Sequence, residues 1–248
     1  MSTATANART HAEYVLPGRR YDHIFFSGVA LLMLATAFVG FARSYYLAGV
    51  FQAPLPSRLV HIHGAAFSAW VVLLVTQTSL VSAGRVDIHR RLGIGGFLLA
   101  CLMVVLGVMT ATESLSRPSP VGGDVKAFYI FPMTSMLIFS VLIFWAYRMR
   151  SNPAAHKRLI LAATTALLIA AVSRWPIAFV QRRPPEAALV TYIFLLMMAG
   201  YDYWSTGKVH RATIWASAFL IIVQRVAFPF GHTAAWHAFA TWAQGVGH

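Results

Sequence analysis

The chain has 248 residues, of which 58% are hydrophobic and 11% are charged, and its 20 Lys and Arg against 7 Asp and Glu give a net charge of +13. Soluble domains carry about 25% charged residues, and nucleic-acid binders gather basic residues on one polar face, whereas long apolar runs separate them here. A soluble globular enzyme, a disordered chain and a nucleic-acid binder are therefore excluded. A disulfide scaffold is excluded too, because Cys101 is the single cysteine.

Seven apolar runs predict an all-α integral membrane protein, a bundle of seven transmembrane helices. A run of about 20 apolar residues is long enough to cross a bilayer as a helix. In chain order the runs cover residues 23–42, 59–83, 92–113, 127–147, 158–180, 187–204 and 212–229. We expect one transmembrane domain, residues 23–229, between a frayed polar tail, residues 1–22, and a short amphipathic tail, residues 230–248, on the outer surface.

Basic residues predict the orientation of the bundle. Lys and Arg are more frequent in the N-terminal tail and the second, fourth and sixth loops than in the other loops. The positive-inside rule then places the N-terminus in the cytoplasm and the C-terminus outside. We expect a multi-pass protein of the bacterial inner membrane, with anionic lipids as partners at the cytoplasmic face.

Three of the loops on the predicted cytoplasmic side end alike. In each, a histidine followed by a basic residue opens an outward-running helix, at His89, His156 and His210. This similarity suggests a helix hairpin used three times, although three short matches also arise by chance. Asp202 lies near His210 in the sequence, and a carboxylate beside a histidine orients it as a metal ligand. The inner cluster is predicted to hold a metal or haem; the alternative is that these helix starts bind lipid headgroups.

A second polar cluster is expected at the outer ends of the spans. Arg174 and Arg225 lie ~26 Å and ~21 Å along their helices. A charge at such depth costs at least ~2.5–3.5 kcal/mol, so a partner is expected, with Glu113 as the best candidate and Asp124 as an alternative. Alternatively, Arg174 or Arg225 extends to the outer interface. The cluster also contains His61, His63, His232 and His237.

The two outer histidines near residue 60 lie on different faces of their helix. His61 and His63 are two residues apart, which is about 200° around an α-helix. Gly64 gives a small, flat surface beside His61, and a porphyrin ligated by a helical histidine needs such a surface. The alternative is a histidine in a polar interfacial network.

Two histidine-containing segments carry a resemblance to known families. His61-Ile-His63-Gly64, with Gln77 and Gly84-Arg-Val-Asp-Ile-His89-Arg-Arg-Leu-Gly93, resembles uncharacterised bacterial multi-pass membrane proteins. The chain is also loosely similar to families associated with oxidase assembly and to the cytochrome b561 type, in which helical histidines ligate two haems on opposite sides of the membrane. The chain departs from that type because His61 and His63 have no histidine partner inside another span.

Three functions follow as hypotheses, and whether the protein is an enzyme stays open. The first is a protein that binds haem b or copper and serves respiratory electron transfer or oxidase assembly, since imidazole suits iron and copper. Its outer site would use His61 or His63 with His232 or His237, and Arg174 or Arg225 would pair haem propionates. Its inner site would use two of His89, His156 and His210.

The other two hypotheses need no cofactor. One is a non-catalytic accessory subunit that packs against a larger respiratory or other membrane complex through its small residues Gly93, Gly95, Gly96 and Gly107. The other is a small-solute or proton-coupled transporter. It would use the buried charges of Arg225, Glu113 and Asp202, because intramembrane ionisable groups often mark transport pathways.

Overall fold

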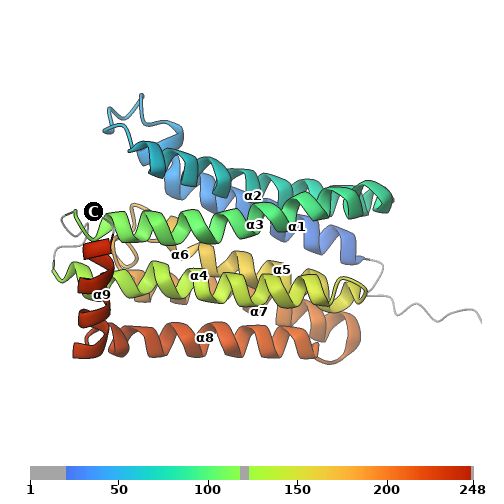
Figure 1. Cartoon of the computed structure of the whole chain (residues 1–248). Coiled ribbons are helices and arrows are strands. Elements are labelled where there is room, and N and C mark those ends of the chain that lie inside the picture. Colours follow the sequence, from blue (N-terminus) through green and yellow to red (C-terminus); the bar gives the residue numbers. More distant parts are fainter. Residues whose placement is uncertain (1–20, 118–122, 247–248) are drawn as a thin grey trace, which may run out of the picture.

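The computed structural model describes residues 21–117 and 123–246, and this part of the chain is helical, with no strand. The helices are α1 (Asp22–Phe41), followed by a π-helical turn η2 (Ala42–Tyr46), α2 (Arg58–Ser82), α3 (Val86–Ser114), α4 (Val125–Arg148), α5 (Pro153–Leu167), α6 (Ile169–Val172), α7 (Pro184–Thr206), α8 (Arg211–Gly231) and α9 (Ala234–Val246). Seven of these segments, counting α1 with η2 and α5 with α6, are long and apolar enough to cross a membrane. The prediction of seven long apolar helices is confirmed, and these helices are compatible with a multi-pass membrane bundle (Figure 1).

Most of the predicted tail, residues 1–22, lies outside the described residues. Its last residue, Asp22, begins α1. Local signals explain several other helix ends. The Ser57 hydroxyl accepts from the Val60 amide at the start of α2, and Asn152 caps α5 just before a proline at its first position. Gly207 ends α7 in the left-handed conformation, which glycine adopts without steric cost.

The fifth predicted span, residues 158–180, is too long at its far end. The helix ends at Val172, and Arg174 lies in the irregular segment that follows. Pro176 explains the difference, because a proline disfavours helical geometry at the preceding residue and cannot donate a backbone hydrogen bond. Arg174 is therefore not a charge within a transmembrane helix.

The helices run along one axis, and the bundle has two distinct ends (Figure 1). One end, which we call the α9 end, carries α9 across the ends of α3, α4 and α8. The opposite end, which we call the His89 end, holds the starts of α1, α3, α5 and α8. In Figure 1, α2 and α8 lie on opposite sides of the bundle. The segment formed by α5 and α6 lies between them. It is the most buried of the seven, with 72% of its apolar stretch inside the bundle, against 17% for α2.

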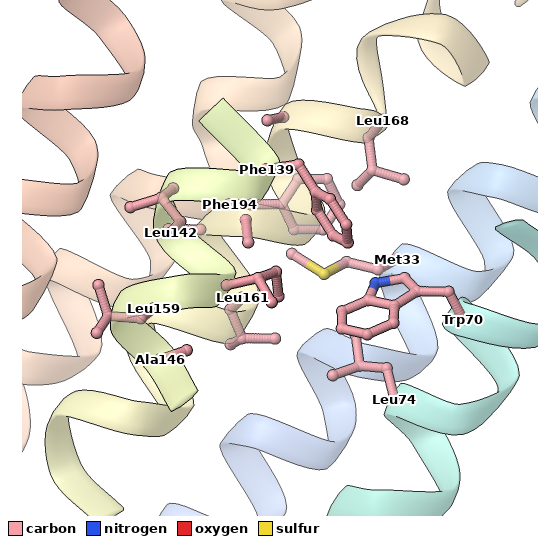
Figure 2. Packing of buried hydrophobic residues seen from close by; sticks show 14 of the residues in the cluster. Met33, Trp70, Leu74, Phe139, Leu142, Ala146, Leu159, Leu161, Leu168 and Phe194 are labelled. Atoms are coloured by element: carbon pink, nitrogen blue, oxygen red, sulfur yellow. The ribbon is translucent and has the colours of Figure 1, made fainter. Parts of the chain in front are cut away.

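The core gathers around α5, and small side chains on this helix let its neighbours come close. Figure 2 shows Met33 of α1, Trp70 of α2 and Phe139 of α4 converging on Leu161 of α5. The Trp70 indole donates to the hydroxyl of Thr164, 3.1 Å away, so this polar group is paired within the core. Buried residues on α5 include Ala162, Ala163, Thr164, Thr165 and Ala166. Such small residues permit close helix packing in membranes.

Two glycines lie where helices cross at short range. A Cβ atom on Gly40 of α1 would lie 2.3 Å from the carbonyl oxygen of Ala171, and one on Gly107 of α3 would lie 2.2 Å from Met136 Sδ. The small-residue surface predicted on α3 is thus used for packing within this chain at Gly107 and at Gly96, which contacts Leu73. Gly95 faces open space, so the predicted surface is not one continuous contact.

The predicted C-terminal helix exists and packs against the bundle. Trp236 is buried, and its indole donates to the carbonyl oxygen of Lys126 over 2.7 Å. Its ring also lies beside Tyr129 and Phe239. Trp242, on the same helix, stays largely exposed. The apolar face of α9 therefore docks onto α4, in addition to any contact with the membrane surface.

Candidate functional site

A buried ion pair joins three helices at the His89 end. Arg158 of α5 and Asp202 of α7 are 5% and 1% exposed, and two nitrogens of the guanidinium donate to Asp202 Oδ1. The other carboxylate oxygen accepts from the hydroxyl of Thr213 and from the backbone amide of His210, 3.1 Å away. Asp202 is therefore held by four donors and links α5, α7 and the start of α8. All of these contacts of Asp202 are with groups of this chain, and its predicted roles as a metal ligand or a transport group stay predictions.

A second ion pair lies next to the first and ties α1 to the bundle. Lys157 of α5 binds the carboxylate of Asp22, which also accepts from the Tyr201 hydroxyl over 2.7 Å. The Tyr201 ring stacks on Phe25 with ring centres 4.0 Å apart, and Lys157 Nζ lies 4.1 Å from the centre of the Phe26 ring. Charged groups from α1, α5 and α7 are thus paired across helices.

Two of the predicted inner histidines come together at this end. The ring centres of His89 and His156 lie 6.4 Å apart, with the ring planes nearly perpendicular. His156 Nδ1 lies 2.8 Å from the carbonyl oxygen of Ala146, which it can satisfy only as a donor. In the orientation that satisfies its whole amide group, Gln77 donates to His89 Nδ1 over 2.8 Å and accepts from the Gly93 amide. In both rings Nδ1 is engaged in a hydrogen bond, so Nε2 is the ring nitrogen that remains available to a ligand.

The third inner histidine does not join this pair. His210 caps α8, and its Nδ1 accepts from the Ala212 amide over 3.0 Å. Burial lowers the pKa of His210, and the nearby charge of Arg158 acts in the same direction. Across residues 21–117 and 123–246, no three His, Cys, Asp or Glu side chains are placed to hold one metal ion. His210 thus lies apart from His89 and His156, and these two form one of the pairs that the sequence left open.

At the α9 end, the surface predicted to receive a porphyrin is filled by an aromatic ring. The Tyr45 hydroxyl lies 3.3 Å from His61 Nδ1 and 3.1 Å from its carbonyl oxygen. A Cβ atom on Gly64 would lie 2.8 Å from the Tyr45 ring. Gly64 thus makes room for Tyr45. His63 packs against Phe67, and its buried Nδ1 has no hydrogen-bond partner in the described part of the chain.

The predicted partners of these histidines are bound elsewhere. His232 Nδ1 lies 2.9 Å from the Phe228 carbonyl oxygen in its own helix, and His237 Nε2 lies 3.0 Å from a carboxylate oxygen of Asp124. Their helices, α8 and α9, pack on α4, whereas α2 packs on α1 and α3. The structure therefore does not bring the predicted outer ligand set together.

The predicted pairing of Glu113 with a deep arginine is also wrong. Glu113 binds Arg117, one turn further along the chain, and the Ser57 hydroxyl lies 3.3 Å from it. Arg174 donates to the Ala170 carbonyl oxygen and lies over the Phe41 ring, 4.6 Å from its centre. Glu113 and Arg117 are four residues apart, so they meet without any contact between distant segments, which explains why Glu113 pairs with Arg117.

Arg225 lies on the wall of a cavity at the α9 end. The cavity has a volume of about 240 Å³ and lies between α4, α6, α7 and α8. The guanidinium carbon of Arg225 is 5.8 Å from the centre of the Tyr192 ring. The neighbouring Gln224 also lines the cavity, and neither polar atom of its buried amide has a hydrogen-bond partner among the described residues.

No protein-family model, curated protein or solved structure matches the chain. The resemblance to uncharacterised bacterial membrane proteins and to the cytochrome b561 type stays a prediction.

Two residues of these sites escaped the sequence reasoning. Arg158 is three or four residues from the small residues Ala155 and Ala162, and the same spacing leads to Thr165. This spacing places Arg158 on the inward face of the helix and Lys157 off it. Gln224 gave no signal of its own, because one amide in an apolar helix is compatible with many environments.

Proposed function

We propose that the protein binds a transition-metal ion, as the iron of haem b or as copper, between His89 and His156. The observation that carries the proposal is the distance of 6.4 Å between the two ring centres. With a metal–nitrogen bond of about 2.0 Å and a ring nitrogen about 1.1 Å from the ring centre, two imidazoles on opposite sides of one ion have centres about 6.2 Å apart.

The hydrogen bond of His156 supports the same proposal, whereas that of His89 requires a change in its partner. Metal-bound histidines usually donate their other ring N–H to a carbonyl or carboxylate, and His156 has the Ala146 carbonyl oxygen in that position. His89 would need the Gln77 amide to turn so that its oxygen accepts from Nδ1, because Nε2 must lose its proton to bind a metal. Gln77 is then the residue that sets the ligand state of His89.

A bound haem or copper would supply one-electron redox chemistry, which suits electron transfer or oxidase assembly in a bacterial inner membrane. With the N-terminus in the cytoplasm, as the basic loops predict, the pair lies on the cytoplasmic side. There it would exchange electrons with a partner at that face. The threefold hairpin repeat remains part of this proposal, because His89 and His156 open the second helix of two such hairpins.

A reduced-minus-oxidised visible spectrum of the detergent-purified protein, with metal analysis of the same sample, tests the proposal. We expect a b-type haem band or about one copper per chain. His89→Ala and His156→Ala should each lose it, while the matched control His232→Ala should keep it, since His232 lies at the other end.

A flat spectrum in a metal-free sample would overturn the proposal and favour the accessory-subunit or transporter hypotheses. Loss of the metal in His61→Ala or His63→Ala, with retention in His89→Ala and His156→Ala, would move the centre to the α9 end and also contradict the assignment. In the transporter hypothesis, Glu113 and Asp202 would have to exchange their present partners Arg117 and Arg158 during transport.

A further inference from the structure

The cavity at the α9 end combines apolar walls with a small polar group of side chains. It is lined by Phe131, Thr134, Tyr192, Gln224, Arg225 and Phe228, together with the first turn of α7. Its 240 Å³ corresponds to about eight water molecules at liquid density. This is below the 300–1,000 Å³ that is typical of sites for drug-sized ligands. The cavity therefore has room for a head group or a very small molecule.

The charge on its wall has no carboxylate partner in the described part of the chain. Arg225 forms no ion pair within the described residues. Four of the described carboxylates bind other side chains: Asp22 binds Lys157, Glu113 binds Arg117, Asp124 binds His237 and Asp202 binds Arg158. The other two, Asp87 and Glu186, lie beside Arg85 and Arg183. Arg225 is exposed at the surface of the bundle and is not buried as the sequence predicted; it lies ~21 Å along α8 from its start, a depth at which a lone charge facing lipid is costly.

The adjacent amide lacks partners as well. Both polar atoms of Gln224 are buried without a hydrogen bond in the part of the chain that the structure describes. A buried amide without partners costs free energy, and a ligand that bonds to it recovers this cost. The Arg225 guanidinium, which has no ionic partner among the described residues, and the Gln224 amide thus line the same cavity, next to the rings of Phe131 and Phe228.

We infer that this cavity binds a monovalent oxyanion, a carboxylate or a phosphodiester, carried on an apolar body. A guanidinium donates two parallel hydrogen bonds to such a group, and the Gln224 amide can donate a further one. One positive charge matches one negative charge, and the apolar walls match an aliphatic chain. A fatty acid and an anionic phospholipid share this chemistry. The inference is independent of the proposed metal centre, which lies at the other end of the bundle.

The experiment compares ligands that differ only in charge. Thermal unfolding of the purified protein is measured with decanoate and with decanol, and in nanodiscs of phosphatidylglycerol and of phosphatidylcholine. We expect decanoate or phosphatidylglycerol to stabilise the protein, and their uncharged or zwitterionic counterparts to have little effect. Arg225→Gln should weaken binding about tenfold or more, whereas the control Arg91→Gln, an exposed arginine at the His89 end, should not.

Protection by decanoate assigns a free carboxylate as ligand, and protection by phosphatidylglycerol alone assigns a lipid phosphate. Equal effects of decanoate and decanol together with equal effects of the two lipids would overturn the inference, as would unchanged binding by Arg225→Gln. If Arg225→Gln fails to fold, Gln224→Leu decides the question. That variant keeps the charge and should still weaken binding by about tenfold, and unchanged binding would contradict the proposed role of the amide.

Discussion

The two ends of the bundle differ in how their arginines are paired. At the His89 end, Arg158 and Lys157 bind carboxylates on other helices, and the Arg158–Asp202 pair is buried. At the α9 end, Glu113 binds an arginine one turn away, and Arg225 lines a cavity without an ionic partner among the described residues. Pairs between helices fix the arrangement of the bundle, whereas an unpaired cation beside a cavity remains available to a ligand.

The largest effect is expected from breaking the buried pair at the His89 end. Asp202→Ala leaves the Arg158 guanidinium buried without its carboxylate, which costs about 3–5 kcal/mol. We expect a large loss of thermal stability in detergent, measured by the unfolding midpoint. The matched control is Glu186→Ala, which removes an exposed pair worth about 0–1 kcal/mol.

The double variant Arg158→Met with Asp202→Leu sharpens this test. Replacing both charges by apolar side chains of similar size removes the uncompensated charge, so much of the stability should return. If Asp202→Ala were as stable as Glu186→Ala, the pair would not organise this end, and the contrast between the two ends would fail.

A smaller effect is expected at the α9 end from Trp236→Ala. The substitution removes a buried indole and its hydrogen bond to the Lys126 carbonyl oxygen. We expect it to weaken the packing of α9 on the bundle by about 3 kcal/mol. Hydrogen exchange should accelerate in α9 and remain slow in α5. Trp242→Ala, on the exposed side of the same helix, serves as the control, and equal exchange in the two variants would show that α9 is not held by Trp236.

The smallest effect concerns the dependence of stability on pH at the His89 end. Burial and then the Arg158 charge lower the pKa of His210, with Asp202 opposing and Lys157 adding to the decrease. The folded protein therefore keeps His210 neutral while the unfolded chain takes up a proton near pH 6.5. This contribution to stability is present above about pH 6.5 and is lost as the pH falls through the lower pKa of the folded state.

His210→Asn keeps an N-cap acceptor but cannot titrate. Its unfolding midpoint should fall less than that of the wild type between about pH 8 and pH 5.5, because the Asn side chain takes up no proton. His23→Asn, an exposed histidine at the same end, should behave like the wild type. A pH dependence that is identical in His210→Asn and the wild type would contradict the assigned role.

Local signals were sufficient for the seven spans and for α9. The length of an apolar run and the spacing of Trp236, Phe239 and Trp242 depend only on neighbouring residues, as do caps such as Asn152 before Pro153. The same local logic failed at Arg174, where the apolar run continues but Pro176 has already ended the helix. The inner histidines were placed at the correct end, yet the sequence treated His89, His156 and His210 as equivalent.

The sequence by itself determined the number of helices, their approximate limits and the end at which each charge lies. These features follow from hydropathy and from the rise per residue of a helix, which depend only on neighbouring residues. Only the tertiary structure decided the pairings: His89 with His156, Asp202 with Arg158, Glu113 with Arg117, and Arg225 with a cavity. These depend on how each helix is rotated about its axis and which helix lies beside it. That rotation is set by packing between distant segments, such as Gly107 against Met136, and hydropathy along the chain does not encode it.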